Sequence, residues 1–178
     1  REEFGFAVKD EEVAVTTSAC QGMWAVMQAV LDEGDEVIVP EPYFSPYKDQ
    51  IEMAGGVLVP LPTCEEENFE VNVHRIEPLI TEKTKAILFN TPNNPTGCCF
   101  DQEALEVIAD VAKRHDLLVI ADDIYTIFSY AGPFIPIGTL PGMAERTVTV
   151  RSFSKDYCMT GWRLGYVIAP PQIIEAIT

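Results

Sequence analysis

The stretch Leu117-Leu118-Val119-Ile120-Ala121, followed directly by Asp122-Asp123-Ile124-Tyr125, indicates the fold of this chain. An unbroken apolar run of this length is typical of a strand with both faces covered, as in a parallel sheet between helices. Ile87-Leu88-Phe89 shows the same pattern in a second run, which ends at Asn90. The two runs predict an α/β fold.

Strand-like runs recur along the whole chain, separated by stretches of helical character. We expect strands at Val13–Thr17, Glu36–Pro40, Val57–Leu61, Ala86–Asn90, Leu117–Ala121, Val148–Arg151 and Arg163–Ala169. The helix between the fourth and fifth runs should begin after Asp101, a capping residue type, and close with the positive residues Lys113-Arg114-His115. We therefore predict one domain, a three-layer α/β/α sandwich whose roughly seven-stranded sheet is mostly parallel with one antiparallel strand.

The composition excludes several kinds of partner. The 178 residues are 47% hydrophobic and carry a net charge of −16, which disfavours binding to nucleic acid or to anionic membranes. No apolar run approaches the length of a membrane span. The five cysteines lack the spacing of zinc ligands, so we expect reduced thiols, a cytoplasmic location and no metal.

Polar and small residues follow several of the predicted strands. Ligands of open α/β sheets bind beyond the carboxyl ends of the strands. Ser18-Ala19-Cys20 leads into a helix and could present backbone N–H groups to an anion, or could be an ordinary serine cap. Asn90-Thr91-Pro92-Asn93-Asn94-Pro95-Thr96-Gly97 contains two prolines and a glycine, which predicts a rigid turn that presents amide side chains.

Asp122 stands at the end of a buried strand. A carboxylate there is costly unless it is paired with a cation, and a protonated pyridine nitrogen would be such a cation. A helix cap is an equally good reading of Asp122. Tyr125, three residues later, lies on the same side if this segment forms a helical turn.

A lysine segment completes this edge of the predicted sheet: Ser152-Phe153-Ser154-Lys155, then Gly161-Trp162-Arg163-Leu164-Gly165-Tyr166. A lysine forms an imine with an aldehyde, and hydroxyls with an arginine hold a phosphate, as a pyridoxal phosphate enzyme requires. If the last strand is antiparallel, Arg163 at its start reaches the same edge. A solvated lysine on a loop is the plain alternative, but the combination of signals favours the cofactor site.

Together these segments resemble the class I/II (fold type I) pyridoxal phosphate-dependent aminotransferases. The lysine segment, the Asn-Asn-Pro-Thr-Gly turn and the Asp-x-Ile-Tyr turn occur in the family's order, and the resemblance runs from about Val13 to Pro170. The segment Met159–Tyr166 is similar to the prokaryotic aspartate aminotransferase-like branch.

The resemblance implies roles for individual residues. Lys155 would form the Schiff base with the cofactor and shuttle the proton, and Asp122 would pair with the pyridine nitrogen. Tyr125 and Asn94 would hydrogen-bond the ring's phenolic oxygen, and Phe44 would stack on the ring unless it is a plain core residue. The phosphate would be held by Ser152, Ser154, Arg163 and the backbone of Ala19 and Cys20. The implied reaction is transfer of an amino group between an amino acid and a 2-oxo acid.

The chain departs from the family's pattern in three places and in length. Asp123 stands where glutamate is usual, Asp156 where threonine or serine is usual, and Ser18-Ala19-Cys20 lacks a frequent glycine. Asp156 would place a negative charge close to the Schiff base. Because family members are much longer, residues 1–178 would be the cofactor-binding large domain, without the N-terminal segment and the C-terminal small domain. We expect such a piece to bind cofactor and to be weakly active or inactive alone.

Other activities share the same cofactor residues. The resemblance leaves open C–S lyase or related elimination chemistry, cyclopropane-forming synthase chemistry, and a non-catalytic aminotransferase-like effector domain of a regulator. It also implies a homodimer, because family members complete their sites with residues of the other subunit.

Overall fold

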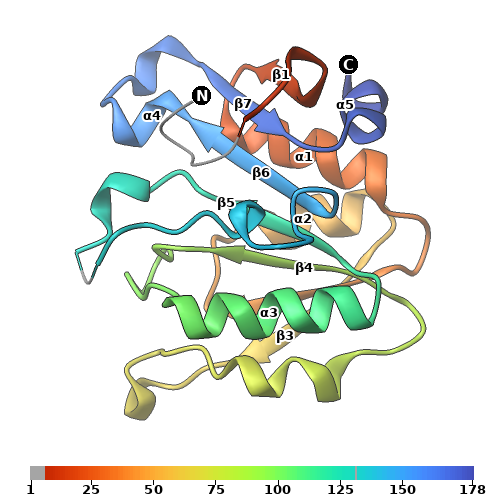
Figure 1. Ribbon diagram of the computed structural model, residues 1–178, viewed down its shortest axis with the longest axis vertical. Helices are drawn as coiled ribbons and strands as arrows, with labels where there is room; N and C mark the ends of the chain where they lie inside the picture. Colours follow the sequence, from red (N-terminus) through yellow and green to blue (C-terminus); the bar gives the residue numbers. More distant parts are fainter. Residues whose placement is uncertain (1–6, 131) are drawn as a thin grey trace.

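A seven-stranded sheet crosses the protein in the computed structural model, which describes residues 7–130 and 132–178 (Figure 1). Its strand order is β1-β7-β6-β5-β4-β2-β3. The strands are β1 Val13–Thr16, β2 Glu36–Glu41, β3 Val57–Pro62, β4 Thr84–Asn90, β5 Leu118–Asp122, β6 Thr147–Ser152 and β7 Gly165–Ile168. Only β7 runs antiparallel to its neighbours, β1 and β6, and the other pairs are parallel. The predicted mixed sheet is confirmed.

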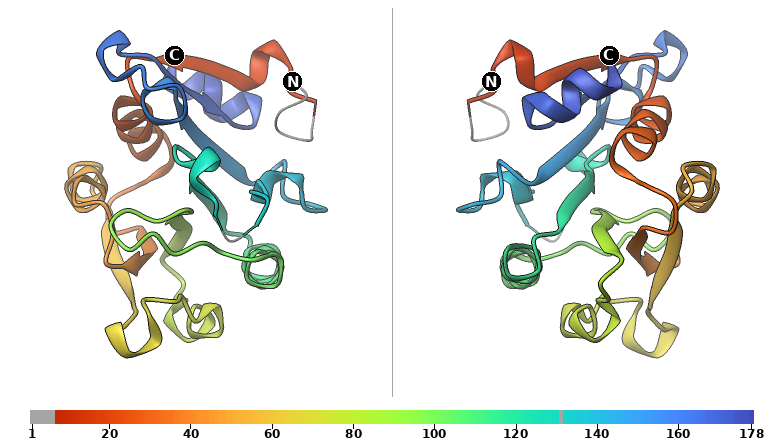
Figure 2. Two further views of the ribbon diagram at one scale, coloured as in Figure 1. Left: turned by 90° about the vertical axis from the view of Figure 1, so that its left-hand side faces the viewer. Right: turned by 90° about the vertical axis from the view of Figure 1, so that its right-hand side faces the viewer.

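Helices cover both faces of the sheet, and Figure 2 shows α1 and α2 on one side and α3 on the other. The α-helices are α1 Ala19–Val30, α2 Pro46–Met53, α3 Gln102–Arg114, α4 Phe153–Asp156 and α5 Pro171–Ile177. Short 3₁₀ turns are η1 Asp10–Glu12, η2 Glu65–Glu67, η3 Val73–Arg75, η4 Glu77–Leu79, η5 Thr126–Phe128, η6 Ile137–Thr139 and η7 Thr160–Trp162. This is the three-layer sandwich that the apolar runs predicted.

The middle of β4 is apolar because its side chains pack into two cores, one on each face of the sheet. On β4, Ala86 and Leu88 pack with α1, α2 and α5, whereas Ile87 and Phe89 pack with α3 and the 3₁₀ turns of the other face. Alternate side chains of a strand point to opposite faces, so a strand covered on both sides needs no polar position. The same alternation decides, at the strand ends, which polar residue faces which layer.

Two predicted helix starts carry the hydrogen bonds that define a cap. Asp101 accepts from the backbone N–H of Ala104 at 2.8 Å, and Ser18 accepts from that of Gln21 at 3.1 Å. These bonds satisfy backbone donors that have no partner within the helix, so they fix where α3 and α1 begin.

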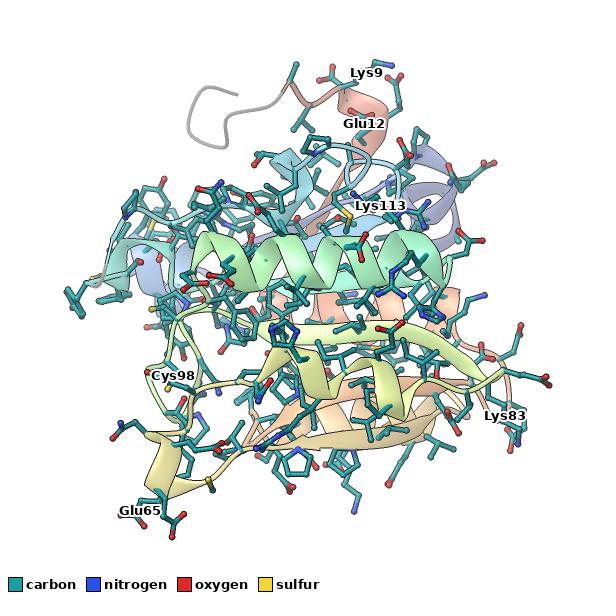
Figure 3. All side chains as sticks on the ribbon, turned by 60° about the horizontal axis from the view of Figure 1, so that its bottom comes forward. Lys9, Glu12, Glu65, Lys83, Cys98 and Lys113 are labelled. Atoms are coloured by element: carbon teal, nitrogen blue, oxygen red, sulfur yellow. The ribbon has the colours of Figure 1, made fainter. Side chains whose placement is uncertain are left out.

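The carboxyl ends of the parallel strands gather at one end of the sheet. In Figure 3, Cys98, which follows the turn after β4, lies at this end, and Lys83, which precedes β4, lies at the other. Within the described residues no helix has the length and apolar character needed to cross a bilayer.

The last strand begins later than the sequence predicted. β7 starts at Gly165, whereas Arg163 closes the 3₁₀ turn η7 in a left-handed conformation, with φ 54° and ψ 55°. The prediction that Arg163 begins the strand is wrong, but its reason, an antiparallel last strand that returns to this edge, is confirmed.

Candidate functional site

A cavity of about 200 Å³ opens at the carboxyl ends of the strands, on the face covered by α1 and α2. Eight of the ten residues predicted for the site line it: Ala19, Cys20, Phe44, Asp122, Ser152, Ser154, Lys155 and Arg163. Ser18, Met23, Tyr47, Gln50, Ile124 and Thr160 complete the lining. Segments that lie far apart in the sequence therefore meet in one place.

Asp122 is the buried carboxyl group of this cavity. It is 5% exposed, and its Oδ2 accepts a hydrogen bond from the Tyr47 hydroxyl. Burial raises the pKa of Asp122 to about 6, against the opposing effects of the Tyr47 hydroxyl and the Ile124 backbone N–H. Its Oδ1 is buried without a hydrogen-bond partner among the described residues. A buried carboxylate oxygen in this state lacks a donor, and a cationic donor would stabilise its charge most.

Three residues of one helical face supply the wall next to Asp122. Phe44, Tyr47 and Gln50 follow one another at intervals of three along α2 and the turn before it. The Phe44 and Tyr47 rings meet edge to face, with centroids 5.6 Å apart. Tyr47 and Gln50 were not predicted from the sequence, although their spacing from Phe44 places them on the same side of a helix.

The opposite end of the cavity is suited to an anion. The first residues of α1 present backbone N–H groups that have no acceptor within the helix, and Ser152 and Ser154 bring hydroxyls from the start of α4. Gln50 stabilises the first turn of α1, because its Nε2 donates to the carbonyl oxygen of Cys20 at 3.0 Å.

Gly165 permits the close approach of β7 to this turn. A Cβ at Gly165 would lie 2.6 Å from the carbonyl carbon of Ser18 and 2.7 Å from the nitrogen of Ala19. Only glycine fits there without moving the backbone that faces the anion.

Arg163 reaches the cavity from the left-handed turn described above. Its Nη1 donates to the carbonyl oxygen of Thr160 at 2.9 Å, and the residue is exposed. A left-handed conformation is uncommon for a residue with a side chain, and it is found where tertiary structure imposes it. Here it directs the chain into β7 and leaves Arg163 at the cavity mouth.

Tyr125 and Asn94 do not line the cavity in this structure. Asn94 is held next to it, because Asn90 accepts from the Asn94 backbone N–H at 2.8 Å and donates to the carbonyl oxygen of Asp122 at 2.7 Å. Burial and the charge of Asp122 both raise the pKa of Tyr125, which places this hydroxyl within electrostatic reach of Asp122. Both residues thus border the site.

A second polar cluster lies on the other face of the same strand ends. Because side chains alternate, Asp123 and Arg151 point away from Asp122 and Ser152. Arg151 lies 3.5 Å from a carboxylate oxygen of Asp156, and both side chains are nearly fully buried. Burial raises the pKa of Asp123 to about 7, with Arg151 opposing the rise.

The pairing of Asp156 changes what its charge does. From the sequence, this carboxylate was expected to act as a negative charge beside the Schiff base. In the structure it pairs with Arg151 and accepts from the Thr126 hydroxyl at 2.6 Å. Its charge is therefore largely compensated on the far side of the strand ends.

The cavity fits the cofactor expected from the sequence. Pyridoxal phosphate carries a ring nitrogen that can be protonated, an aldehyde and a phosphate. The unpartnered Oδ1 of Asp122 suits the first, the amine of Lys155 the second, and the α1 N-terminus with its neighbouring hydroxyls the third.

Known proteins that are similar to this chain are aminotransferases. Residues 3–178 match the family model "Aminotransferase class I and II". The chain is 42% identical to the probable aspartate/prephenate aminotransferase of Thermus aquaticus, covering 99% of this chain and 46% of that protein. It is 46% identical to the aspartate aminotransferase of Pyrococcus abyssi, covering 93% and 43%.

Solved structures give the same result. The aromatic aminotransferase of Pyrococcus horikoshii superposes with a TM-score of 0.95 at 42% identity, covering 99% of this chain and 48% of that one. The chain thus spans less than half the length of the relatives it matches. The cofactor of these enzymes is pyridoxal phosphate, the compound that the cavity fits. The chain belongs to the class I and II aminotransferases.

Proposed function

We propose that this chain is the cofactor-binding large domain of a transaminase that moves an amino group between an amino acid and a 2-oxo acid. One observation carries the proposal: the buried Asp122, with its unpartnered Oδ1, shares a cavity with Lys155. A buried carboxylate oxygen without a donor is costly, and a cationic heterocycle bound next to Lys155 would supply the donor that Asp122 lacks.

Different residues of the cavity would bind the ring and the phosphate of the cofactor. Asp122, oriented by Tyr47, would keep the ring nitrogen of pyridoxal phosphate protonated. Tyr125 and Asn94 would donate hydrogen bonds to the ring's phenolic oxygen, and Phe44 would stack on the ring. The anion end would hold the phosphate through Ser152, Ser154, Arg163 and the backbone of Ala19 and Cys20.

Lys155 would carry the proton in the reaction. When bound, pyridoxal phosphate supplies the electron sink that makes the α-proton of an amino acid acidic enough to remove. The amine of Lys155, once displaced by the substrate's amine, would take that proton from the α-carbon and deliver it to the cofactor's aldehyde carbon. The apolar wall around Phe44 and Met23 would limit access of water to this side of the site.

The proposal also includes the substrates, the oligomeric state and the cellular location. The names of the relatives, which are aspartate/prephenate, aspartate and aromatic aminotransferases, support an amino acid and a 2-oxo acid as substrates. Exposed apolar residues such as Val15 and Trp162, at 75% and 74%, support a homodimer. The five free cysteines support a cytoplasmic location, because thiols stay reduced there.

The test is covalent trapping of the cofactor. The protein is mixed with pyridoxal phosphate, reduced with borohydride and digested, and the peptides are mapped by mass spectrometry. We expect the adduct on Lys155 and none in Lys155→Ala. An adduct spread over several lysines, or none in a folded protein, would contradict the proposed site.

Activity is tested separately from cofactor binding. The full-length protein that contains this chain should convert an amino acid and a 2-oxo acid into the exchanged pair, whereas residues 1–178 alone should turn over weakly or not at all. Release of ammonia and a 2-oxo acid from one amino acid, without exchange, would point to elimination instead. Rapid transamination by residues 1–178 would contradict the assignment as a large domain that is incomplete alone.

A further inference from the structure

Helix α4, which carries Lys155, is too short to fix the direction of this side chain without other contacts. α4 comprises only Phe153–Asp156, and a single turn has no stability of its own in water. Its start is capped by Ser152, whose Oγ accepts from the backbone N–H of Ser154 at 3.0 Å. The direction of Lys155, near its other end, must therefore be set by contacts outside the helix.

The Phe153 backbone N–H donates to the carbonyl oxygen of Leu164, and Asp156 provides side-chain contacts at the end of α4 nearest Lys155. Its side chain is 3% exposed although the residue follows the exposed Lys155 directly. Asp156 Oδ2 accepts from the Thr126 hydroxyl at 2.6 Å and lies 3.5 Å from Nη2 of Arg151, which itself donates to Thr126 Oγ1 at 3.2 Å. One carboxylate thus connects α4 to β6 and to η5.

The connection also reaches the segment of Tyr125, which borders the cofactor cavity. Thr126 opens η5 directly after Tyr125, so the Asp156–Thr126 bond links the segment that carries Lys155 to the segment that carries Tyr125. Successive residues of a helix point about 100° apart, so a buried Asp156 leaves Lys155 directed toward the cavity. Charge-assisted hydrogen bonds between buried groups are the strongest that a protein has for this purpose.

We propose that Asp156 is a positioning residue, which acts through Thr126 and Arg151 to hold Lys155 in the direction that the proposed cofactor chemistry requires. The inference rests on the proposed function. It assigns Asp156 no contact with cofactor or substrate. Asp156 governs how fast the amine of Lys155 meets the cofactor's aldehyde, and leaves the affinity of the rest of the cavity unchanged.

Two measurements on the full-length protein separate these effects. The first is the rate at which pyridoxal phosphate becomes trapped on Lys155, followed by timed borohydride quenching and peptide quantification. The second is the dissociation constant of pyridoxal phosphate in a Lys155→Ala background, where only non-covalent contacts remain. Asp156→Asn should slow trapping by roughly tenfold to a hundredfold, the scale of a displaced reacting group. It should change the dissociation constant less than twofold.

A conservative pair and a matched control complete the design. Thr126→Val removes the hydroxyl and should slow trapping, whereas Thr126→Ser keeps it and should restore the native rate. The same isosteric change at Asp49, exposed on α2, should have no effect on either measurement. If Asp156→Asn does not fold, the Thr126 pair decides the question.

The outcomes distinguish the two proposals. Slower trapping with an unchanged dissociation constant supports the positioning role. Equal losses in both measurements, or equal rates for Thr126→Val and Thr126→Ser, overturn it and leave the proposed function intact. Absence of any adduct on Lys155 in the native protein overturns the proposed function, and the positioning role with it.

Discussion

Removing the Tyr47 hydroxyl tests whether the ionised carboxylate of Asp122 is what binds the cofactor ring. In Tyr47→Phe, the ring and its edge-to-face contact with Phe44 remain, but Asp122 loses the hydrogen bond to its Oδ2. A hydrogen bond to a charged group contributes roughly 1.5–3 kcal/mol. At 1.36 kcal/mol per pKa unit, its loss raises the pKa of Asp122 from about 6 by roughly one to two.

This change should weaken cofactor binding in a manner that depends on pH. At pH 7, the ionised fraction of Asp122 falls from about nine-tenths to between roughly a half and a tenth. Because the cationic ring nitrogen needs the carboxylate, the dissociation constant of pyridoxal phosphate should rise roughly two- to tenfold at pH 7. At pH 9, where Asp122 is ionised in both proteins, the difference should shrink.

The assay is a fluorescence titration of pyridoxal phosphate in the Lys155→Ala background at several pH values, so that the lysine does not contribute. Tyr43→Phe is the matched control, because it removes a hydroxyl from a nearby tyrosine that forms no hydrogen bond with Asp122 in the described structure and lies outside the cavity lining. An equal loss of affinity at pH 7 and pH 9, or no loss at pH 7, would refute the reasoning.

Two further predictions concern stability. Without cofactor, Asp122 and Asp123, with pKa values raised by burial to about 6 and about 7, keep protons that the unfolded chain releases near pH 4. The free energy of unfolding contributed by these groups should therefore fall by a few kcal/mol as pH rises from about 4 to 7, and level off above that. Urea unfolding across this range checks it, and Asp123→Asn should flatten the upper part of the curve; an unchanged slope in that variant would assign the effect to other groups. Gly165→Ala should destabilise the fold by about 1–3 kcal/mol, because the added Cβ meets backbone at 2.6 Å. Gly132→Ala, which meets nothing within 4 Å, should change stability by less than about 0.5 kcal/mol, and equal melting temperatures of the two variants would contradict the steric argument.

The sequence predicted those features that depend on local pattern. Runs such as Leu117–Ala121 became strands because covering both faces of a sheet demands an unbroken apolar segment. The chemistry-bearing turns were found because parallel strands bring their carboxyl ends to one edge. Most of the predicted site residues therefore line one cavity.

The features that the sequence did not predict depend on partners far away in the chain. Tyr47 and Asp122 are 75 positions apart, and neither residue alone indicates the hydrogen bond between them. Asp156 looked like an extra charge near the lysine, because its pairing with Arg151 depends on how α4 is turned relative to the end of β6. The start of β7 was misplaced because the left-handed turn at Arg163 is imposed by tertiary structure.

The place of β7 between β1 and β6 also sets an order of events during synthesis. The β1–β7 pairing joins Val13 to Ile168, a separation of roughly 150 residues, and closing so long a loop is among the slowest steps that a fold contains. The ribosome releases the turn at Ser18 early, yet that turn meets the lysine segment only after the last strand has emerged. A nascent chain can therefore assemble β2, β3, β4 and β5 while it has no complete anion end, so cofactor capture should come after nearly all of this domain has been made.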